Sequence, residues 1–377
     1  ILHISHTDIT IDGRILKELD SLYAEGIYNV VAIGASLNED APPAENNTKY
    51  PIETLKLFFN KTRWKPHFLR YCFAATELLF RLVLSGVRQR PKVVHCHDTL
   101  VLPAGLLIKL FTGCKLIYDA HELESNKNGQ SKVFSKATLL IEKLCWSKVD
   151  ALISVSPSIL DWYSDNLGEK KNILILNTPR FSEELTLNTE NNRYFHEKFS
   201  IPESELVFLY LGMLGEGRGI ESLLDVFSRK DINSHIVFMG YGPLKDLIIS
   251  AGQDSPKIHL HSPVKHDQVV PLTRNADVGL CFIEDVSLSD YLCLPNKLFE
   301  YAFSRLPILA SDFPDMKKVI NDYRLGVCSK NDVESIKSAV QGLEQSSPNA
   351  CEMNDLSVLS WEQQERRLIS LYESLLK

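Results

Sequence analysis

Short apolar runs alternate with helical stretches along nearly the whole chain, and this alternation constrains the fold more than any other feature. The runs are continuously apolar, as expected for parallel strands buried on both faces of a sheet. They cover residues 1–5, 30–33, 92–95, 115–118, 150–155 and 172–176, and then 206–211, 235–239, 257–260, 278–283, 307–310 and 326–328. The pattern predicts an α/β protein with two doubly wound, Rossmann-like domains facing a cleft.

The length of the chain agrees with two domains. Its 377 residues exceed one ordinary domain, and each half is apolar enough to bury a core. Residues 178–204 are polar and aperiodic, so we expect the linker there. We predict a first domain over 1–180 and a second over 181–357, with a terminal helix in 358–377 that packs back on the first domain.

Composition excludes several classes of protein. With 44% hydrophobic and 24% charged residues the chain is not disordered, and a net charge of −7 argues against a nucleic-acid binder. The eight cysteines include no Cys-x-x-Cys, and no apolar run reaches the ~18 residues of a membrane span. Neither Asp-x-Asp nor a His/Cys pattern with metal spacing occurs. We therefore expect a cytoplasmic protein with no metal and no cofactor.

Two glycine-rich loops follow expected strands in the second half. Residues 212–219 lie between the strand at 206–211 and a helix over 220–227, and a second glycine pair follows residue 239. Glycines let the backbone approach a ligand, and a helix N-terminus attracts anions. Flexible turns explain the same glycines without a ligand. The loop glycines in question are Gly212, Gly215, Gly217, Gly240 and Gly242.

The segment 294–301 carries the most specific pattern. Pro295 can begin a helix, which places Lys297 and Glu300 on one face of its first turn. A carboxylate there can hold a ribose diol, and the ammonium can meet a phosphate. The alternative is an exposed ion pair that contributes only a few tenths of a kcal/mol.

Motifs along nearly the whole chain, most strongly over 205–312, resemble one enzyme family. They are the Gly-x5-Arg-Gly-Ile loop at 212–220, Gly240-Tyr241-Gly242-Pro243, Asn275–Leu280, Pro295–Tyr301 with Pro307, the Ser360-Trp361 helix, Val94–Asp98 and Tyr118–Glu122. In order and spacing these motifs resemble the retaining, glycogen-synthase-like GT-B glycosyltransferases often called family 4.

The resemblance implies a nucleotide diphospho-sugar donor on the second domain, an acceptor on the first, and metal-independent transfer. Glu300 matches the second carboxylate of the family's Glu-x7-Glu element, whereas Leu292 replaces the first and Asp290 is the nearest acid. The implied catalytic residues are His121, Arg218 and Lys297. The implied donor-binding residues are the five loop glycines with Val264, Asp290, Leu298 and Glu300.

Three first-domain residues are candidates for the acceptor side. Asp12 and Arg14 follow the first strand, and His97 ends another. Asp12 fits a helix cap equally well, and His97 fits loop packing. His121 matches the family histidine that usually touches the transferred sugar or its phosphate; the alternative is a structural histidine.

Residues 55–73 form a basic, aromatic stretch in an acidic protein. Lys61, Arg63 and Lys65 alternate there with apolar and aromatic side chains, and no acid interrupts them. This composition favours contact with an anionic membrane surface, although a helix and loop covering their own domain explain it as well.

Together these features predict a glycosyltransferase that builds a surface glycan on a glycan or lipid-linked acceptor, on the inner face of the membrane. The alternatives are a nucleotide-sugar 2-epimerase of the same fold and a non-catalytic relic that only binds nucleotide sugars.

Overall fold

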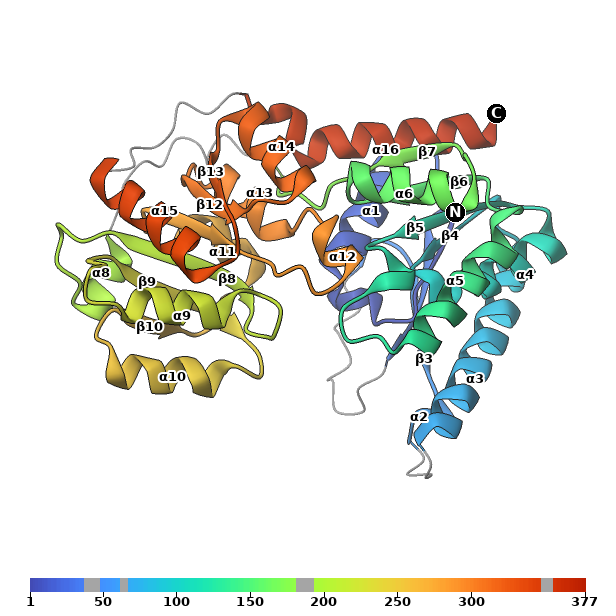
Figure 1. Cartoon of the computed structure of the whole chain (residues 1–377). Coiled ribbons are helices and arrows are strands. Elements are labelled where there is room, and N and C mark those ends of the chain that lie inside the picture. Colours follow the sequence, from blue (N-terminus) through green and yellow to red (C-terminus); the bar gives the residue numbers. More distant parts are fainter. Residues whose placement is uncertain (37–47, 62–66, 181–192, 347–354) are drawn as a thin grey trace. The chain divides into compact units, whose positions relative to one another are not determined.

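The computed structural model describes residues 1–36, 48–61, 67–180, 193–346 and 355–377. The chain divides into two compact units (Figure 1). The first unit contains residues 1–175 and 364–377, and the second contains 176–363. Each unit is described by itself.

The first unit is built on a seven-stranded parallel sheet with the order β3-β2-β1-β4-β5-β6-β7. Strands β4 and β6 are fully buried, as the continuous runs predict, although β4 also buries the polar side chains of His95 and His97. The strands are β1 (Leu2–Ile4), β2 (Val31–Ser36), β3 (Ile52–Lys56), β4 (Val93–His97), β5 (Lys115–Ala120), β6 (Ala151–Ser154) and β7 (Asn172–Leu174).

Helices connect these strands, and the last helix of the chain ends in this unit. Tyr372 near its C-terminus is fully buried and reaches His95 of β4 with its hydroxyl. The helices are α1 (Gly13–Ala24), α2 (Phe58–Lys61), α3 (His67–Arg88), α4 (Leu102–Thr112), α5 (Lys132–Trp146), α6 (Pro157–Leu167) and α16 (Trp361–Leu376).

The second unit repeats the architecture with a six-stranded parallel sheet of order β10-β9-β8-β11-β12-β13. The strands are β8 (Val207–Met213), β9 (His235–Tyr241), β10 (Ile258–His261), β11 (Val278–Cys281), β12 (Ile308–Ser311) and β13 (Gly326–Ser329). The helices are α8 (Tyr194–Phe199), α9 (Ile220–Ser228), α10 (Lys245–Asp254), α11 (His266–Thr273), α12 (Leu288–Tyr291), α13 (Asn296–Phe303), α14 (Pro314–Tyr323) and α15 (Val333–Ser346).

Two doubly wound parallel sheets confirm the predicted fold class. In each sheet the strand order reverses next to the first strand, between β1 and β4 in one unit and between β8 and β11 in the other. Ligands of open α/β sheets bind at the carboxyl ends of the strands beside such a switch point. The two strand edges are therefore where functional side chains are expected.

The structure adds two elements that the sequence did not indicate. The linker expected over 178–204 contains the helix α8, which buries Phe195 in the second unit. Strand β3 went unpredicted because it lies at the sheet edge, where only Leu55 is buried and the sequence lacks a continuous apolar run.

Candidate functional site

The two glycine loops of the second unit pack against each other through their backbones. A side chain at Gly240 would place its Cβ 1.8 Å from the carbonyl oxygen of Gly212, so only glycine fits there. Leu214 donates its backbone N–H to the carbonyl of Tyr241 (2.8 Å), and Gly242 lies against Leu214 in the same way. Gly240 and Gly242 therefore have a structural reason to be glycine, independent of any ligand.

The β8 loop also contacts the segment that follows β11. The carbonyl of Gly217 accepts a hydrogen bond from the N–H of Glu284 (2.9 Å), and Gly212 and Gly217 both have positive φ angles, 112° and 75°. Gly215 lies between them, and a Cβ at this position would lie 3.8 Å from the side chain of Met213, an ordinary van der Waals distance. These contacts hold the loop at the β8–β11 switch point, with α9 beginning at its end.

Arg218 and Asp290 meet at this edge. One guanidinium nitrogen of Arg218 lies 3.5 Å from Oδ1 of Asp290, and Oδ2 of Asp290 accepts a hydrogen bond from the hydroxyl of Ser287 (2.7 Å). Arg218 keeps 34% of its side chain exposed, whereas Asp290 keeps 10%. The buried carboxylate thus anchors a cation that still reaches solvent.

Lys297 supplies a second cation from the first turn of α13, which begins directly after Pro295. Its Nζ lies 3.9 Å from the ring centroid of Tyr210 and donates to the carbonyl of Phe282 (3.3 Å). The residue is only 9% exposed, and among the described residues no carboxylate forms an ion pair with it. A buried ammonium held by a ring and a carbonyl is poised to bind an anion.

The thiol of Cys281 lies at the end of β11. Burial raises its pKa to about 12; the charge of Lys297 acts to lower the pKa, that of Glu300 to raise it and that of Arg218 to lower it. Each of these three charges therefore lies within electrostatic range of the thiol.

The other two donor-side candidates lie in different surroundings. Leu298 is fully buried in the core, so its side chain has no access to a ligand. Val264 follows β10 and lines a surface hollow of about 480 Å³ together with Tyr194 and His261.

In the first unit, Asp12 and Arg14, which are expected on the acceptor side, both form structural contacts. Asp12 caps α1 by accepting the backbone N–H groups of Arg14 and Ile15, each at 3.0 Å. Arg14 is 5% exposed and donates to Asp119 (3.0 Å) and to the carbonyl of Ile175 (2.9 Å). A buried guanidinium in this position holds the strand ends together.

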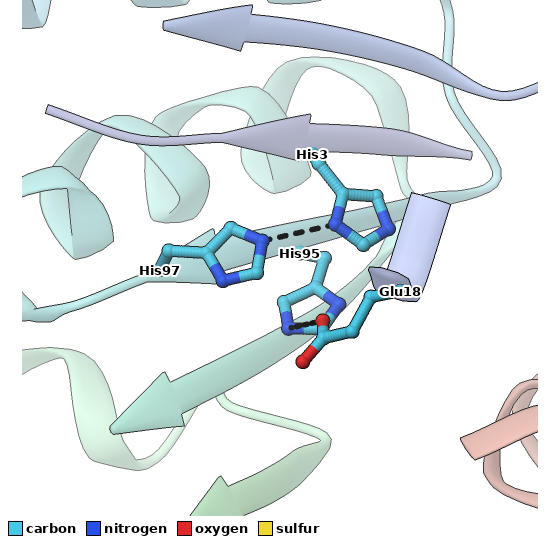
Figure 2. A group of neighbouring side chains, drawn as sticks. All are labelled: His3, Glu18, His95 and His97. Atoms are coloured by element: carbon cyan, nitrogen blue, oxygen red, sulfur yellow. Dashed lines mark hydrogen bonds and ion pairs between the residues drawn. The ribbon is translucent and has the colours of Figure 1, made fainter. Parts of the chain in front are cut away.

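His97 is likewise buried, within a group of histidines that sequence spacing did not reveal. Figure 2 shows His3, His95 and His97 gathered beside Glu18, with a hydrogen bond between Nδ1 of His3 and Nε2 of His97 (2.9 Å). Burial lowers the pKa of His95 to about 3, whereas burial and Asp119 raise the pKa of Glu18 to about 8. His97 therefore has no free surface for an acceptor.

Two groups of side chains in this region lie close enough together to be considered as metal sites. Donor atoms of His3, Glu18, His95 and His97 lie within 4.8 Å of one another, as do those of His97, Asp119 and His121. However, the rings of His95 and His97 are 4.4 Å apart and only 19° from parallel. Lone pairs lie in the ring planes, so those of His95 and His97 do not converge on one ion, which argues against the first of the two groups as a tetrahedral metal site.

His121 is the one member of this group that approaches the surface, with 20% of its side chain exposed. Its Nε2 lies 3.3 Å from Oδ2 of Asp119, and its Nδ1 lies 3.8 Å from Oδ1 of Asp98. Burial opposes a charge on the ring, but the two carboxylates outweigh burial and raise the pKa of His121 to about 10. His121 is thus a charged histidine directly after β5, and it is the partly exposed member of a buried polar network.

Comparison with known proteins identifies the family to which the chain belongs. The family model described as Glycosyltransferase Family 4 matches residues 21–178, and the one described as Glycosyl transferases group 1 matches residues 205–346. Sucrose-phosphate synthase from Thermosynechococcus elongatus is similar in structure, with a TM-score of 0.78 and 14% identity over 99% of this chain and 98% of that one. The chain is a glycosyltransferase of the GT-B fold.

Two further comparisons help to place the glycosyltransferase. Anabaena HepE, solved in complex with UDP-glucose, has a TM-score of 0.73 with 10% identity over 99% of both chains. An uncharacterized glycosyltransferase of Methanocaldococcus jannaschii is 27% identical over 190 residues, which is 48% of each chain. The matched region spans about half the length of that curated relative.

None of the helices in the described part of the glycosyltransferase is both long and apolar enough to cross a membrane.

The charge of His121 predicts how stability depends on pH. Because its pKa is about 10 in the folded state and about 6.5 in the unfolded one, its ion pairs stabilise fully below pH ~6.5 and are lost as pH rises towards 10. We expect His121→Asn to lower the free energy of unfolding by about 2–4 kcal/mol at pH 6 and by much less at pH 10. Urea unfolding of both proteins across this range measures the difference. A difference in the free energy of unfolding that increases with pH would contradict the positive charge assigned to His121.

Proposed function

We propose that the glycosyltransferase moves a sugar from a nucleotide diphospho-sugar to a glycan or lipid-linked acceptor, with retention, in surface polysaccharide biosynthesis. The observation that carries the proposal is that Arg218, Lys297 and Glu300 all lie within electrostatic range of Cys281, at the end of β11. Two cations suit a diphosphate, and a carboxylate suits a ribose diol. The UDP-glucose complex of HepE supports the same class of donor.

The chemical step requires stabilisation of the leaving diphosphate. As the glycosidic bond breaks, negative charge develops on the phosphate oxygen, and preorganised cations stabilise that charge more than they stabilise the ground state. Arg218, anchored by Asp290, and Lys297, held over Tyr210, are preorganised in this sense. In a retaining transfer on one face, the leaving phosphate oxygen receives the proton of the acceptor hydroxyl.

We assign to His121 a contact with the transferred sugar or its phosphate. As an imidazolium it carries one N–H on each ring nitrogen: Nε2 faces Asp119, whereas Nδ1 lies 3.8 Å from Asp98, beyond hydrogen-bond distance. Part of the ring is exposed and therefore open to a ligand. Asp98 and Asp119 hold the ring, which limits the reorganisation needed during the reaction.

An exposed apolar stripe on helix α5 supports the proposal of a lipid-linked acceptor. Helix α5 buries Thr138, Glu142 and Cys145 on one side, and on the other exposes a stripe at 133, 137, 140 and 144. Leu144 in this stripe is 68% exposed. The exposed lysines on this helix are Lys132, Lys136 and Lys143. An apolar stripe flanked by cations is the pattern of a helix lying in an anionic membrane surface.

The structure describes only part of the basic stretch predicted over 55–73. Arg63 and Lys65, and the side chain of Lys61, lie outside the described residues. Within the described part, Tyr71 and Phe73 of α3 are exposed, and the ring of Tyr71 lies under the guanidinium of Arg70. The α5 stripe therefore offers the clearer test of membrane contact.

Replacing Lys132, Lys136 and Lys143 together with Ser should weaken binding to phosphatidylglycerol liposomes. Each basic residue near an anionic surface contributes about 1 kcal/mol, so the loss should approach a hundredfold. Liposome co-sedimentation at low salt measures it, and high salt should release the unaltered protein as well.

The control for this experiment removes the same charge from the other unit, where Lys245, Lys318 and Lys330 are exposed. Their triple replacement with Ser should leave liposome binding unchanged. If the two triple variants lose liposome binding equally, only the net charge of the protein matters. The assignment of α5 as the membrane-binding surface would then be wrong.

The function itself is tested by ligand screening followed by a transfer assay. UDP, GDP, ADP and their sugars should include one that raises the melting temperature, because ligand binding to the folded state stabilises it by mass action. The preferred sugar nucleotide should then yield a glycosylated lipid or glycan with a retained anomeric configuration. Conversion of UDP-GlcNAc without any acceptor would instead indicate an epimerase, and binding without any product would indicate a relic.

A further inference from the structure

Tyr241 carries an aromatic ring that the fold of the second unit does not use. Among the described residues of this unit it is the only Phe, Tyr or Trp that is exposed, with an exposed fraction of 70%. It is also the last residue of β9, at the edge of the sheet where ligands of open α/β sheets bind. A large apolar ring that contributes little to the core therefore stands at the ligand edge.

The backbone around Tyr241 is held closely against the β8 loop. A Cβ at Gly240 would lie 1.8 Å from the carbonyl oxygen of Gly212, and one at Gly242 would lie 2.3 Å from that of Leu214. The carbonyl of Tyr241 accepts the backbone N–H of Leu214 at 2.8 Å. The ring is thus carried by a segment with little freedom to move, and a ligand that meets it does not have to order it first.

Met213 places a second exposed apolar side chain next to Tyr241. The two residues are register partners at the ends of β8 and β9, and Met213 is 56% exposed. Its carbonyl accepts a hydrogen bond from the hydroxyl of the buried Tyr210 at 3.0 Å, which fixes the backbone here as well. The ends of two neighbouring strands therefore both present apolar surface to solvent.

The charged side chains of the donor site lie two strands away from Tyr241. Arg218, Lys297 and Glu300 are within electrostatic range of the end of β11, and β8 separates β11 from β9 in the sheet. Adjacent strands are spaced by ~4.8 Å, so the ends of β11 and β9 are about 10 Å apart. A nucleoside diphosphate likewise has charged phosphates at one end and a flat base at the other, with the ribose between them.

We propose that the ring of Tyr241 stacks on the nucleobase of the donor and holds the nucleoside end of the molecule. Base–aromatic stacking changes affinity by about 5- to 150-fold, and it tolerates different bases because every base has a flat π face. Tyr241 therefore supplies affinity for a nucleoside without choosing the base. This assignment rests on the nucleotide diphospho-sugar donor of the proposed function.

Titration calorimetry with UDP, GDP and ADP tests the contribution of the ring. Tyr241→Ala should weaken binding of the preferred nucleoside diphosphate about 5- to 150-fold, whereas Tyr241→Phe should bind it as the unaltered protein does. Ile249→Ala is the matched control, because Ile249 is an exposed apolar residue of α10 in the same unit. It should leave the affinity unchanged.

The same titrations distinguish the base from the transferred sugar as the group under the ring. If the base is stacked, Tyr241→Ala loses affinity already for the sugar-free nucleoside diphosphate. A loss that appears only with the sugar nucleotide would place the sugar on the ring and overturn the proposal.

A tryptophan at position 241 reports the contact without any activity measurement. In Tyr241→Trp, the preferred nucleoside diphosphate should quench the fluorescence of the added indole, because a stacked base lies against it. In Ile249→Trp, quenching should not exceed that of the unaltered protein, which contains four tryptophans of its own. A Tyr241→Trp protein that binds the nucleotide with no additional quenching would contradict the stacking.

These outcomes separate this inference from the proposed function. If the unaltered protein binds none of the three nucleotides or their sugars, the proposed donor is wrong and the assignment of Tyr241 is wrong with it. If the unaltered protein binds one of them and Tyr241→Ala binds it equally well, the donor stands and only the assignment of Tyr241 is wrong.

Discussion

Replacing Arg218 with Ala, or Lys297 with Met, should lower the turnover of sugar transfer by ~10²-fold or more. Both cations lie within electrostatic range of the end of β11. In the proposed reaction, the leaving diphosphate gains negative charge near them in the transition state. Met retains the aliphatic stem that packs beside Tyr210, so the variant removes charge rather than volume. Because the cations act mainly on developing charge, turnover should fall more than donor affinity.

A surface lysine of the same unit provides the matched control. Lys317 pairs with Asp312 at 2.8 Å and is 53% exposed, so Lys317→Met should leave turnover unchanged. Activity of the unaltered enzyme should also survive EDTA. Full turnover in either cation variant, or a strict requirement for Mg²⁺, would contradict the assignment of these two residues to the diphosphate.

Replacing Glu300 with Ala should weaken binding of the preferred nucleotide by about 1.5–3 kcal/mol, or roughly 10- to 150-fold. The reason is that a carboxylate accepting from both ribose hydroxyls forms charge-assisted hydrogen bonds. Glu300 is half-buried on α13, one turn after Lys297, so the helix presents both groups to one ligand. Titration calorimetry with the nucleotide identified by thermal shift measures the loss.

A 2′,3′-dideoxyribose analogue makes this test specific. The unaltered protein should bind the analogue much more weakly than the normal nucleotide, and Glu300→Ala should bind the two about equally. Glu334→Ala is a suitable control, because Glu334 forms only an exposed pair with Arg229. If Glu300→Ala still prefers the ribose form, the diol is held by another group.

The fold class and the main elements of the second unit could be predicted from the sequence. Continuous apolar runs mark strands buried on both faces, and Pro295 and the loop glycines mark where helices begin. These signals are local, because each depends on residues within a few positions of one another. The motifs around Arg218, Lys297 and Glu300 were found for the same reason.

Other features could be recognised in the sequence but not interpreted. The spacing of Val133, Leu140 and Leu144 shows that they share one face of a helix, but periodicity does not say whether that face meets the core or the solvent. The sequence likewise did not show whether Gly240 is needed for a ligand to approach or for two backbone segments to pack. The answer, a backbone contact with Gly212, depends on two loops separated by a whole helix and strand.

The buried network of the first unit was decided by tertiary structure alone. In the sequence, Asp119 is only one residue of the Tyr118–Glu122 motif. In the structure, β5 lies beside β4, and Arg14 of α1 forms an ion pair with Asp119. Tyr372 and His95 are 277 residues apart, yet they share a hydrogen bond. Strand order and helix docking are set by the burial of apolar surface over the whole unit. The sequence therefore determined which elements form, whereas long-range packing determined which of their polar side chains meet.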